Sequence, residues 1–176
     1  PPTLEPVPVL ALLEEMKELL EASRPEDVEF ECSGPEGIRV LADRDQLKQV
    51  LWNLANNGVH AMPKGGSLKF AVSAVASEEA QERHADGRKG EKSDKSRQSP
   101  DRLGVEISVS DSGVGILQED QERIFEPFFT TKAEGTGLGL ATVHRVVEGH
   151  GGSIRVESQE GGTTVRLQLP GPGGRK

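Results

Sequence analysis

Apolar residues recur at helical intervals in two stretches of the chain. The first stretch runs from Val9 to a stop near Pro25, and its apolar positions are Val9, Leu12, Leu13, Met16, Leu19 and Leu20. The second begins at Asp43, a helix-capping residue three positions before Gln46, and ends at Pro63; its apolar or small positions are Leu47, Val50, Leu51, Leu54, Gly58 and Ala61. Intervals of three and four residues place each set on one side of a helix, so two amphipathic helices are predicted.

Shorter stretches alternate between apolar and polar residues, which is typical of strands with one buried face. The predicted strands are centred on residues 28–32, 38–41, 68–72, 105–109, 154–156 and 165–169, with a turn rich in glycine and proline between the first two. Alternation, in place of continuous apolar runs, favours a mixed and mostly antiparallel sheet whose helices cover one face only. The predicted fold is therefore a two-layer α/β sandwich of the α+β class.

Composition divides the chain into one domain and its flanking segments. With 176 residues, of which 34% are hydrophobic, the chain has enough apolar side chains for one core. Residues 77–102 contain no Val, Ile, Leu, Met, Phe or Trp, and their acidic and basic residues balance, so we predict a mobile insertion within a domain over 9–170. The proline-rich residues 1–8 are predicted to end a linker from a missing upstream domain, and residues 171–176 are predicted to be a disordered tail.

The overall charge narrows the range of partners. A net charge of -8 disfavours nucleic acid and anionic membranes, because surfaces that bind them need clustered Lys and Arg. No apolar run approaches the roughly 18 to 20 residues that a membrane span needs. The single cysteine, Cys32, excludes an intramolecular disulfide and fits a reducing compartment. The sequence therefore predicts a cytoplasmic domain without direct membrane contact, and leaves open whether its parent protein is anchored.

Polar residues line one face of the second predicted helix. In the run QVLWNLANNGVH, this face carries Gln49, Asn53, Asn57 and His60. Side-chain amide oxygens suit a hard Mg²⁺ ion that already carries nucleotide phosphates. A solvated helix face explains the same residues without any function, so both interpretations stay open at this point.

The run DSGVGI, residues 111–116, directly follows a predicted strand. An acidic side chain such as Asp111 at a strand end can accept a hydrogen bond from the exocyclic amine of a base. Gly113 and Gly115 would let a flat ring approach the backbone closely. A plain β-turn explains this run, taken alone, at least as well.

Further glycines precede a helix that is predicted to end near Gly149. In GTGLGLA, residues 135–141, they expose backbone N–H groups at the positive end of the helix dipole, which favours phosphate. The run is neither a P-loop nor a Rossmann fingerprint, because no Lys follows the last glycine and no βαβ unit frames it. Upstream, the run EPFFTTK at 126–132 places two aromatic residues in a loop that suits a lid or a docking surface. In Gly-Gly-Thr at 161–163, a tight hairpin explains the glycines and leaves Thr163 as the candidate.

The order of these runs resembles that of a known family. NLANNGVHA, DSGVGI, ERIFEPFF, GTGLGLA and GGT resemble, in turn, the N box, the first glycine box, the F box and the second and third glycine boxes of the histidine-kinase catalytic domain. This domain belongs to the GHKL, or Bergerat-fold, ATPase superfamily. The resemblance spans roughly residues 43–169, and EPFFTTKAEGTGLGLATVHRVVEGHGG is most similar to the nitrogen-regulation type of sensor kinase. It implies a Bergerat fold, with ATP and Mg²⁺ as ligands.

The resemblance also implies a role for each matching residue. Asn57 matches the principal Mg²⁺ ligand and Asn53 the supporting one, so these two are the implied catalytic residues. Asp111 matches the aspartate that specifies adenine. The other implied nucleotide contacts are Gly113, Gly115 and Ile116 at the base, Thr163 near the adenine through water, Thr136, Gly137, Leu138 and Gly139 at the phosphates, and Lys132 in the lid. His60 stands where related kinases often carry a lysine near the phosphates.

One position separates the kinases of this superfamily from its ATP-hydrolysing members. Those members place a glutamate general base one turn before the Mg²⁺ asparagine, and the residue here is Asn53. An amide does not accept a proton at neutral pH, so activation of water is predicted to be poor.

The phosphate acceptor is predicted to lie outside this chain, on a helical domain that precedes Pro1, with a response regulator as the downstream partner. No histidine of the chain resembles the acceptor box of the family; the four are His60, His84, His144 and His150. An anti-sigma-type serine kinase and a non-catalytic nucleotide-binding module are the alternatives.

Overall fold

The computed structural model describes residues 1–23, 27–75, 104–131 and 137–173. Its helices and strands, in chain order, are β1 (Glu5–Pro8), α1 (Val9–Ser23), β2 (Val28–Ser33), β3 (Arg39–Ala42), α2 (Arg44–His60), β4 (Gly66–Val75), β5 (Gly104–Asp111), α4 (Gln118–Gln121), α5 (Gly139–Gly149), β6 (Ser153–Gln159) and β7 (Gly162–Pro170). The insertion predicted at 77–102 lies outside the described residues.

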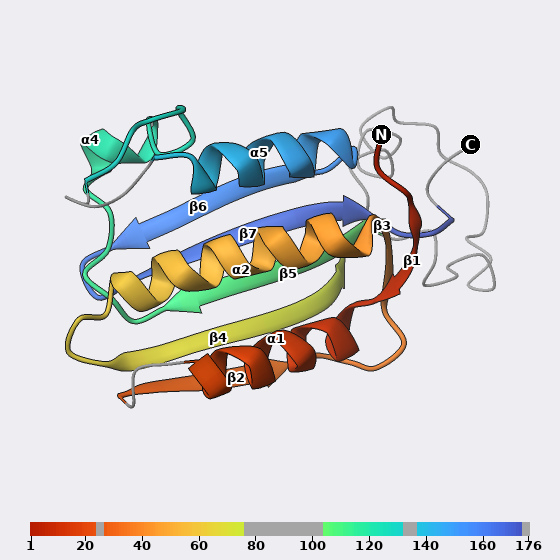
Figure 1. The fold of residues 1–176 in the computed structure, drawn as a ribbon, viewed down its shortest axis with the longest axis horizontal. Helices are drawn as coiled ribbons and strands as arrows, with labels where there is room; N and C mark the ends of the chain where they lie inside the picture. The colour runs from red at the N-terminus through yellow and green to blue at the C-terminus, as the bar shows by residue number, and fades with distance from the viewer. Residues whose placement is uncertain (24–26, 76–103, 132–136, 174–176) are drawn as a thin grey trace, which may run out of the picture.

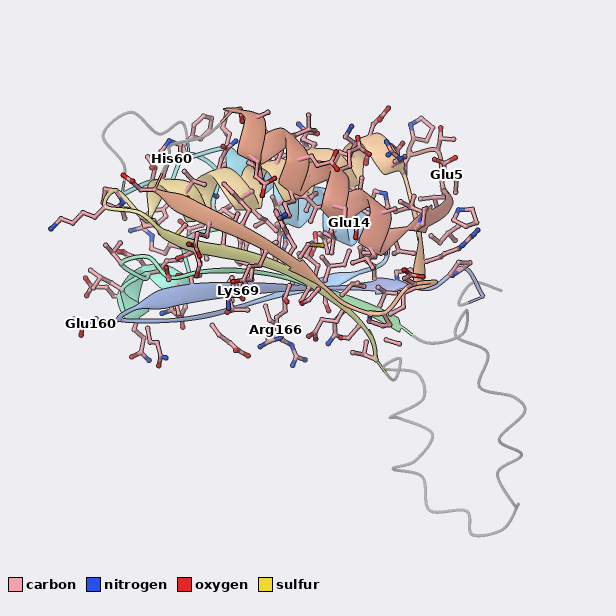
Figure 2. The ribbon with its side chains drawn as sticks, turned by 90° about the horizontal axis from the view of Figure 1, so that it is seen from below. Glu5, Glu14, His60, Lys69, Glu160 and Arg166 are labelled. Carbon is pink, nitrogen blue, oxygen red and sulfur yellow. The ribbon has the colours of Figure 1, made fainter. Side chains whose placement is uncertain are left out.

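Five strands form the main sheet, in the order β2-β4-β5-β7-β6. β2 runs parallel to β4, and the other neighbouring pairs are antiparallel. α1, α2 and α5 lie on one face of this sheet (Figure 1), and the view from below shows helices and strands as two layers (Figure 2). The prediction of a two-layer α/β sandwich with a mixed, mostly antiparallel sheet is confirmed.

Alternation along the strands separates a buried face of the sheet from an open one. Phe70 of β4 and Leu167 of β7 are fully buried beneath the helices. Lys69 and Arg166, on the same two strands, point away from the helices (Figure 2), and Arg166 pairs with Glu106 at 3.1 Å. The apolar core therefore lies between the main sheet and the helices, and it extends to Val7 of β1 and Val40 of β3.

α2 begins at a hydrogen-bonded N-cap, as predicted. Oδ1 of Asp43 accepts the backbone N–H groups of Asp45 and Gln46, each at 3.1 Å, and its Oδ2 accepts the N–H of Thr3 at 2.9 Å. These backbone donors, with Thr3 the strongest, hold the pKa of the Asp43 carboxyl below its usual value. The N-terminal segment is thereby attached to the start of α2.

Residues 5–8 belong to the segment that is predicted to end a linker, and they have regular structure. Residues 5–8 form β1, which pairs antiparallel with β3 in a separate two-stranded sheet, and Val7 is only 1% exposed. A single buried valine among prolines produces no periodic pattern, so this pairing is not visible in the sequence. β2 and β3, although adjacent along the chain, join different sheets. In the predicted tail, Gly171 is buried, and 174–176 lie outside the described residues.

The connection between β4 and β5 leaves the sheet at the end away from Asp111. The two strands are antiparallel neighbours, and their pairing runs from Leu68 opposite Asp111 to Val75 opposite Gly104. The chain between the last two residues contains the predicted insertion.

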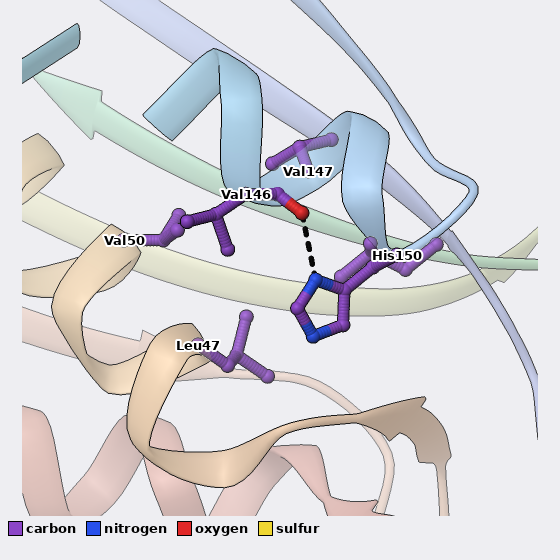
Figure 3. A pocket seen from close by; sticks show the side chains of 6 residues that line it. Leu47, Val50, Val146, Val147 and His150 are labelled. Carbon is purple, nitrogen blue, oxygen red and sulfur yellow. Dashed lines mark hydrogen bonds between the residues drawn. The ribbon is translucent and has the colours of Figure 1, made fainter. Parts of the chain in front are cut away.

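His150 joins the end of α5 to the start of α2. Its side chain is 2% exposed and borders a small cavity between the two helices (Figure 3), whose other lining residues are Leu47, Val50, Val146, Val147 and Leu169. Nδ1 lies 2.7 Å from the Val146 carbonyl oxygen, and Nε2 accepts the backbone N–H of Asp43 at 3.0 Å. A neutral ring with its hydrogen on Nδ1 satisfies both partners.

Replacing His150 by leucine is expected to lower the free energy of unfolding by about 1–3 kcal/mol, because the Asp43 N–H loses its acceptor. Urea unfolding of the chain, followed by circular dichroism, measures this. His144→Leu is the control, because that ring makes only local contacts, with Glu148 at 3.5 Å and with the Phe125 ring at a centroid distance of 5.5 Å, each worth about 1 kcal/mol or less. Equal unfolding midpoints for the two variants would show that the hydrogen bond between Asp43 and His150 does not contribute to stability.

Candidate functional site

Four residues opposite one another in the sheet form a row across β4, β5, β7 and β6. Leu68 of β4 lies opposite Asp111 of β5, Asp111 lies opposite Thr163 of β7, and Thr163 lies opposite Ser158 of β6. Side chains of directly opposed residues share a face of a sheet. Leu68 and Thr163 are buried on the helix-facing side, so the Asp111 carboxylate points toward the helices.

Gly58 of α2 makes room for that carboxylate. A Cβ atom at this position would lie 2.5 Å from Cδ1 of Leu68 and 3.2 Å from Cβ of Asp111. Only a glycine lets the helix pass this closely over the strand end. The glycine within the predicted Mg²⁺ helix therefore has a structural task, which is to bring α2 next to the aspartate.

The loop at 112–116 is held on both sides by close backbone packing. The N–H of Gly113 donates to Oδ1 of Asp111 at 2.9 Å, and the N–H of Val114 donates to the Ala61 carbonyl at 3.0 Å. A Cβ at Gly113 would meet the Ala61 carbonyl oxygen at 2.4 Å. Gly115, with φ of +80°, passes the Gln159 backbone in the same way. Both glycines fix the loop between α2 and β6, which is more than a plain β-turn requires.

The polar face of α2 contacts the beginning of α5. Nδ2 of Asn53 donates to the Gly139 carbonyl at 3.4 Å, and Asn57 is half-buried one turn further along. His60 is exposed, and its Nδ1 lies 2.7 Å from the Asn56 carbonyl oxygen on its own helix. Asn53 therefore borders Gly139 at the start of α5, whereas the His60 ring lies along the surface of α2.

The F-box and second glycine-box residues are joined by their backbones. The N–H of Phe128 donates to the Gly137 carbonyl at 3.0 Å, and a Cβ at Gly137, whose φ is +70°, would lie 2.4 Å from the Phe128 carbonyl carbon. Phe128 itself has a φ of +66° and is 76% exposed; Leu138 is 42% exposed. Lys132 and Thr136 fall between these joined segments and lie outside the described residues.

Ser158 is a member of the site that sequence patterns do not reveal. Its Oγ lies 2.7 Å from the N–H of Ile116 and 2.6 Å from Oγ1 of Thr163. Gln121 of α4 adds a second connection, because its Nε2 donates to the carbonyls of Ile116 at 3.0 Å and Ser158 at 3.2 Å. Only the register between β6 and β7 places Ser158 here, and one sequence does not specify that register.

These contacts bring most of the predicted site residues together. Asp111, Gly113, Gly115, Ile116 and Thr163 form one group at the strand ends. Asn53 and Gly139 link α2 to the N-terminus of α5, where Gly137 and Leu138 also lie. The set offers a carboxylate acceptor, amide oxygens suited to Mg²⁺, and N–H groups at the positive end of a helix of 11 residues. This chemistry fits a magnesium-bound purine nucleotide.

Comparison with known proteins identifies the class. Residues 42–173 match the family described as "Histidine kinase-, DNA gyrase B-, and HSP90-like ATPase", and the chain belongs to this family. It is 46% identical to the sensor histidine kinase ZraS of Escherichia coli over 132 residues, which are 74% of this chain and 23% of that relative. The chain thus spans less than a quarter of the length of ZraS.

Solved structures support the same class. The catalytic domain of histidine kinase ThkA is 32% identical, with a TM-score of 0.72, and the similarity covers 98% of this chain and 99% of that one. Histidine kinase ThkA in complex with response regulator protein TrrA gives a TM-score of 0.70 at 28% identity, over 98% of this chain and 43% of that one. The fold is therefore that of histidine-kinase catalytic domains, as predicted. Within the described residues, no helix combines the length and apolar character needed to cross a membrane.

Proposed function

We propose that this chain binds ATP with Mg²⁺ and transfers the γ-phosphate to a histidine on a separate helical domain of its parent protein. The observation that carries the proposal is the junction of three segments. Asp111 lies beneath α2 at Gly58, and the same helix reaches the N-terminus of α5 through Asn53 and Gly139. A base acceptor, an amide-bearing helix face and a phosphate-binding helix end thus meet on one side of the sheet.

Each group of residues has a defined task in this proposal. Asp111 accepts the 6-amino group of adenine, while Thr163, opposite it on β7, donates toward the ring directly or through one water. The backbone N–H groups at 137–139 bind the phosphates. Asn57 and Asn53 supply amide oxygens to Mg²⁺, which when bound neutralises phosphate charge. Gly113, Gly115 and Ile116 line the base, and Lys132, Thr136 and Leu138 complete the phosphate side.

Poor hydrolysis is part of the proposed function. Asn53 stands one turn before Asn57, and its amide hydrogen bonds to the Gly139 carbonyl, so it is not a general base for water. An imidazole acceptor is already a nucleophile, and transfer then depends mainly on positioning and charge stabilisation. The domain therefore holds ATP until the acceptor domain docks.

The proposed partners follow from the class of the chain. The acceptor is a helical domain of the same parent protein, and a response regulator receives the phosphate from it. ZraS is named as a sensor histidine kinase, and ThkA has been solved with a response regulator. We place this domain in the cytoplasm, where ATP and such regulators are found.

Transfer between molecules tests this function. The chain is mixed with γ-labelled ATP, Mg²⁺ and a full-length parent protein that carries both Asp111→Asn and Asn57→Ala. Label on this parent protein in the absence of the added chain is subtracted as background. Label that is lost in acid and retained in base is expected on the parent protein, because phosphohistidine is acid-labile. Acid-stable label would favour the serine-kinase alternative, and ATP binding without any label would favour the non-catalytic module.

A further inference from the structure

We infer that Ser158 is a positioning residue that sets the direction of the Thr163 hydroxyl and thereby the selectivity of the site for a 6-aminopurine. This inference rests on the proposed nucleotide binding and deepens it. Ser158 lies at the end of the row that contains Asp111 and Thr163, on the far side of Thr163 from the aspartate.

The hydrogen-bond contacts of Ser158 indicate where its own hydrogen goes. Its Oγ accepts the N–H of Ile116 at 2.7 Å, since a backbone N–H can only donate. Two acceptors remain for the hydroxyl hydrogen, which are Oγ1 of Thr163 at 2.6 Å and the Gly162 carbonyl at 3.4 Å. The shorter contact is the stronger one, and an accepted N–H polarises the hydroxyl toward donation. Either hydroxyl can donate across the 2.6 Å contact, and the inferred direction is from Ser158 to Thr163.

This arrangement leaves Thr163 as a donor toward the base. The threonine is 7% exposed, so its hydroxyl direction is set by protein partners and not by bulk water. With one lone pair occupied by Ser158, its hydrogen is available to a partner on the other side of the hydroxyl, which in the proposed complex is the base. Gln121 stabilises the position of Ser158 next to Ile116, because it donates to the carbonyls of both residues.

A fixed donor at Thr163 distinguishes two kinds of purine. In adenine, ring atom N1 is an acceptor and the 6-substituent is an amine that donates to Asp111. In a 6-oxopurine such as hypoxanthine, N1 carries a hydrogen and the 6-substituent is an acceptor. The Thr163 donor would then face the N1–H donor, and the Asp111 carboxylate would face the 6-oxygen, so neither pair could form a hydrogen bond. Unpaired polar groups in a buried site are costly, so the purine with the matching pattern is preferred.

Calorimetric titration of the chain with ADP and with inosine diphosphate tests the inference. Ser158→Ala is expected to reduce the ratio of the two affinities by about three- to tenfold, the range for one neutral hydrogen bond. Ser158→Thr keeps the hydroxyl and is expected to restore the ratio. Ser110→Ala is the matched control, because Ser110 forms the same kind of hydroxyl pair with Thr164 at 2.9 Å on the open face of the sheet.

The outcomes separate the inference from the proposed function. Absence of ADP binding by the unsubstituted chain would overturn the proposed function. If that chain binds ADP but Ser158→Ala weakens both nucleotides equally or leaves both unchanged, Ser158 has no part in selectivity and the inference fails. If Ser158→Ala does not fold, Ser158→Cys, whose thiol is a weak donor, replaces it with the same expectation.

Discussion

Replacing Asp111 by asparagine is expected to weaken ADP binding roughly 10- to 150-fold, the range that corresponds to one hydrogen bond to a charged group. The carboxylate is an acceptor at both oxygens. Oδ1 already accepts the N–H of Gly113 at 2.9 Å, and the 6-amino group of adenine needs the second acceptor. An amide presents an N–H₂ group to one of these donors, so either the loop or the base loses its partner. Calorimetry with ADP in the absence of Mg²⁺ measures the effect at the base alone.

Two controls isolate the role of the Asp111 carboxylate. Glu29→Gln removes one negative charge from an exposed position on β2 and is expected to leave ADP affinity unchanged. Urea unfolding of Asp111→Asn reports whether the loop has loosened. Unchanged ADP affinity in a folded Asp111→Asn variant would mean that the adenine binds elsewhere.

Replacing Asn57 by alanine is expected to abolish the effect of Mg²⁺ on ATP affinity and to slow phosphate transfer to the acceptor domain. The expected loss of rate is roughly 100- to 1000-fold, as for other groups that stabilise developing charge. The physical reason is that Mg²⁺ loses an amide oxygen at the middle of the site, whereas the base and the glycine N–H groups keep their positions. ATP titrations with and without Mg²⁺, together with the transfer assay, measure both effects.

Asn56 offers a matched control on the same helix. Its side chain is turned by about 100° from that of Asn57 and lies on the other side of Asn53 around the helix. Asn56→Ala is expected to keep the response to Mg²⁺ and the rate of transfer. If the two alanine variants show the same response to Mg²⁺ and the same rate of transfer, the proposal that Mg²⁺ binds at Asn57 is wrong.

Local features of this fold can be predicted from the sequence, because each depends on neighbours along the chain. The N-cap at Asp43, the apolar side of α2 and the strand alternation that ends at Asp111 are all of this kind. The two-layer architecture follows from the same alternation. The family motifs then indicated which polar residues would meet, and the structure brings Asp111, Asn53 and Gly139 around α2.

Features that depend on pairing across long sequence distances could not be predicted. The pairing of β1 gives no signal along the chain, because its partner, β3, follows a whole helix later. His150 shows no sequence signal for its bond to Asp43, which lies 107 positions earlier. Ser158 was missed for a related reason, since its importance comes from the side chains placed opposite it by the register of β6 and β7.

The position of the β4–β5 connection in the sheet determines where the length of this chain can change at little cost in folding free energy. Val75 and Gly104 are held opposite each other by the ladder, while Asp111 lies seven residues along β5, about 24 Å away at the usual rise per residue. Once the ends of a loop are fixed in this way, doubling its length costs only about 0.6 kcal/mol. Changes in the length of the chain between these two residues are therefore expected to cost little folding free energy, and they fall at the end of the sheet away from Asp111.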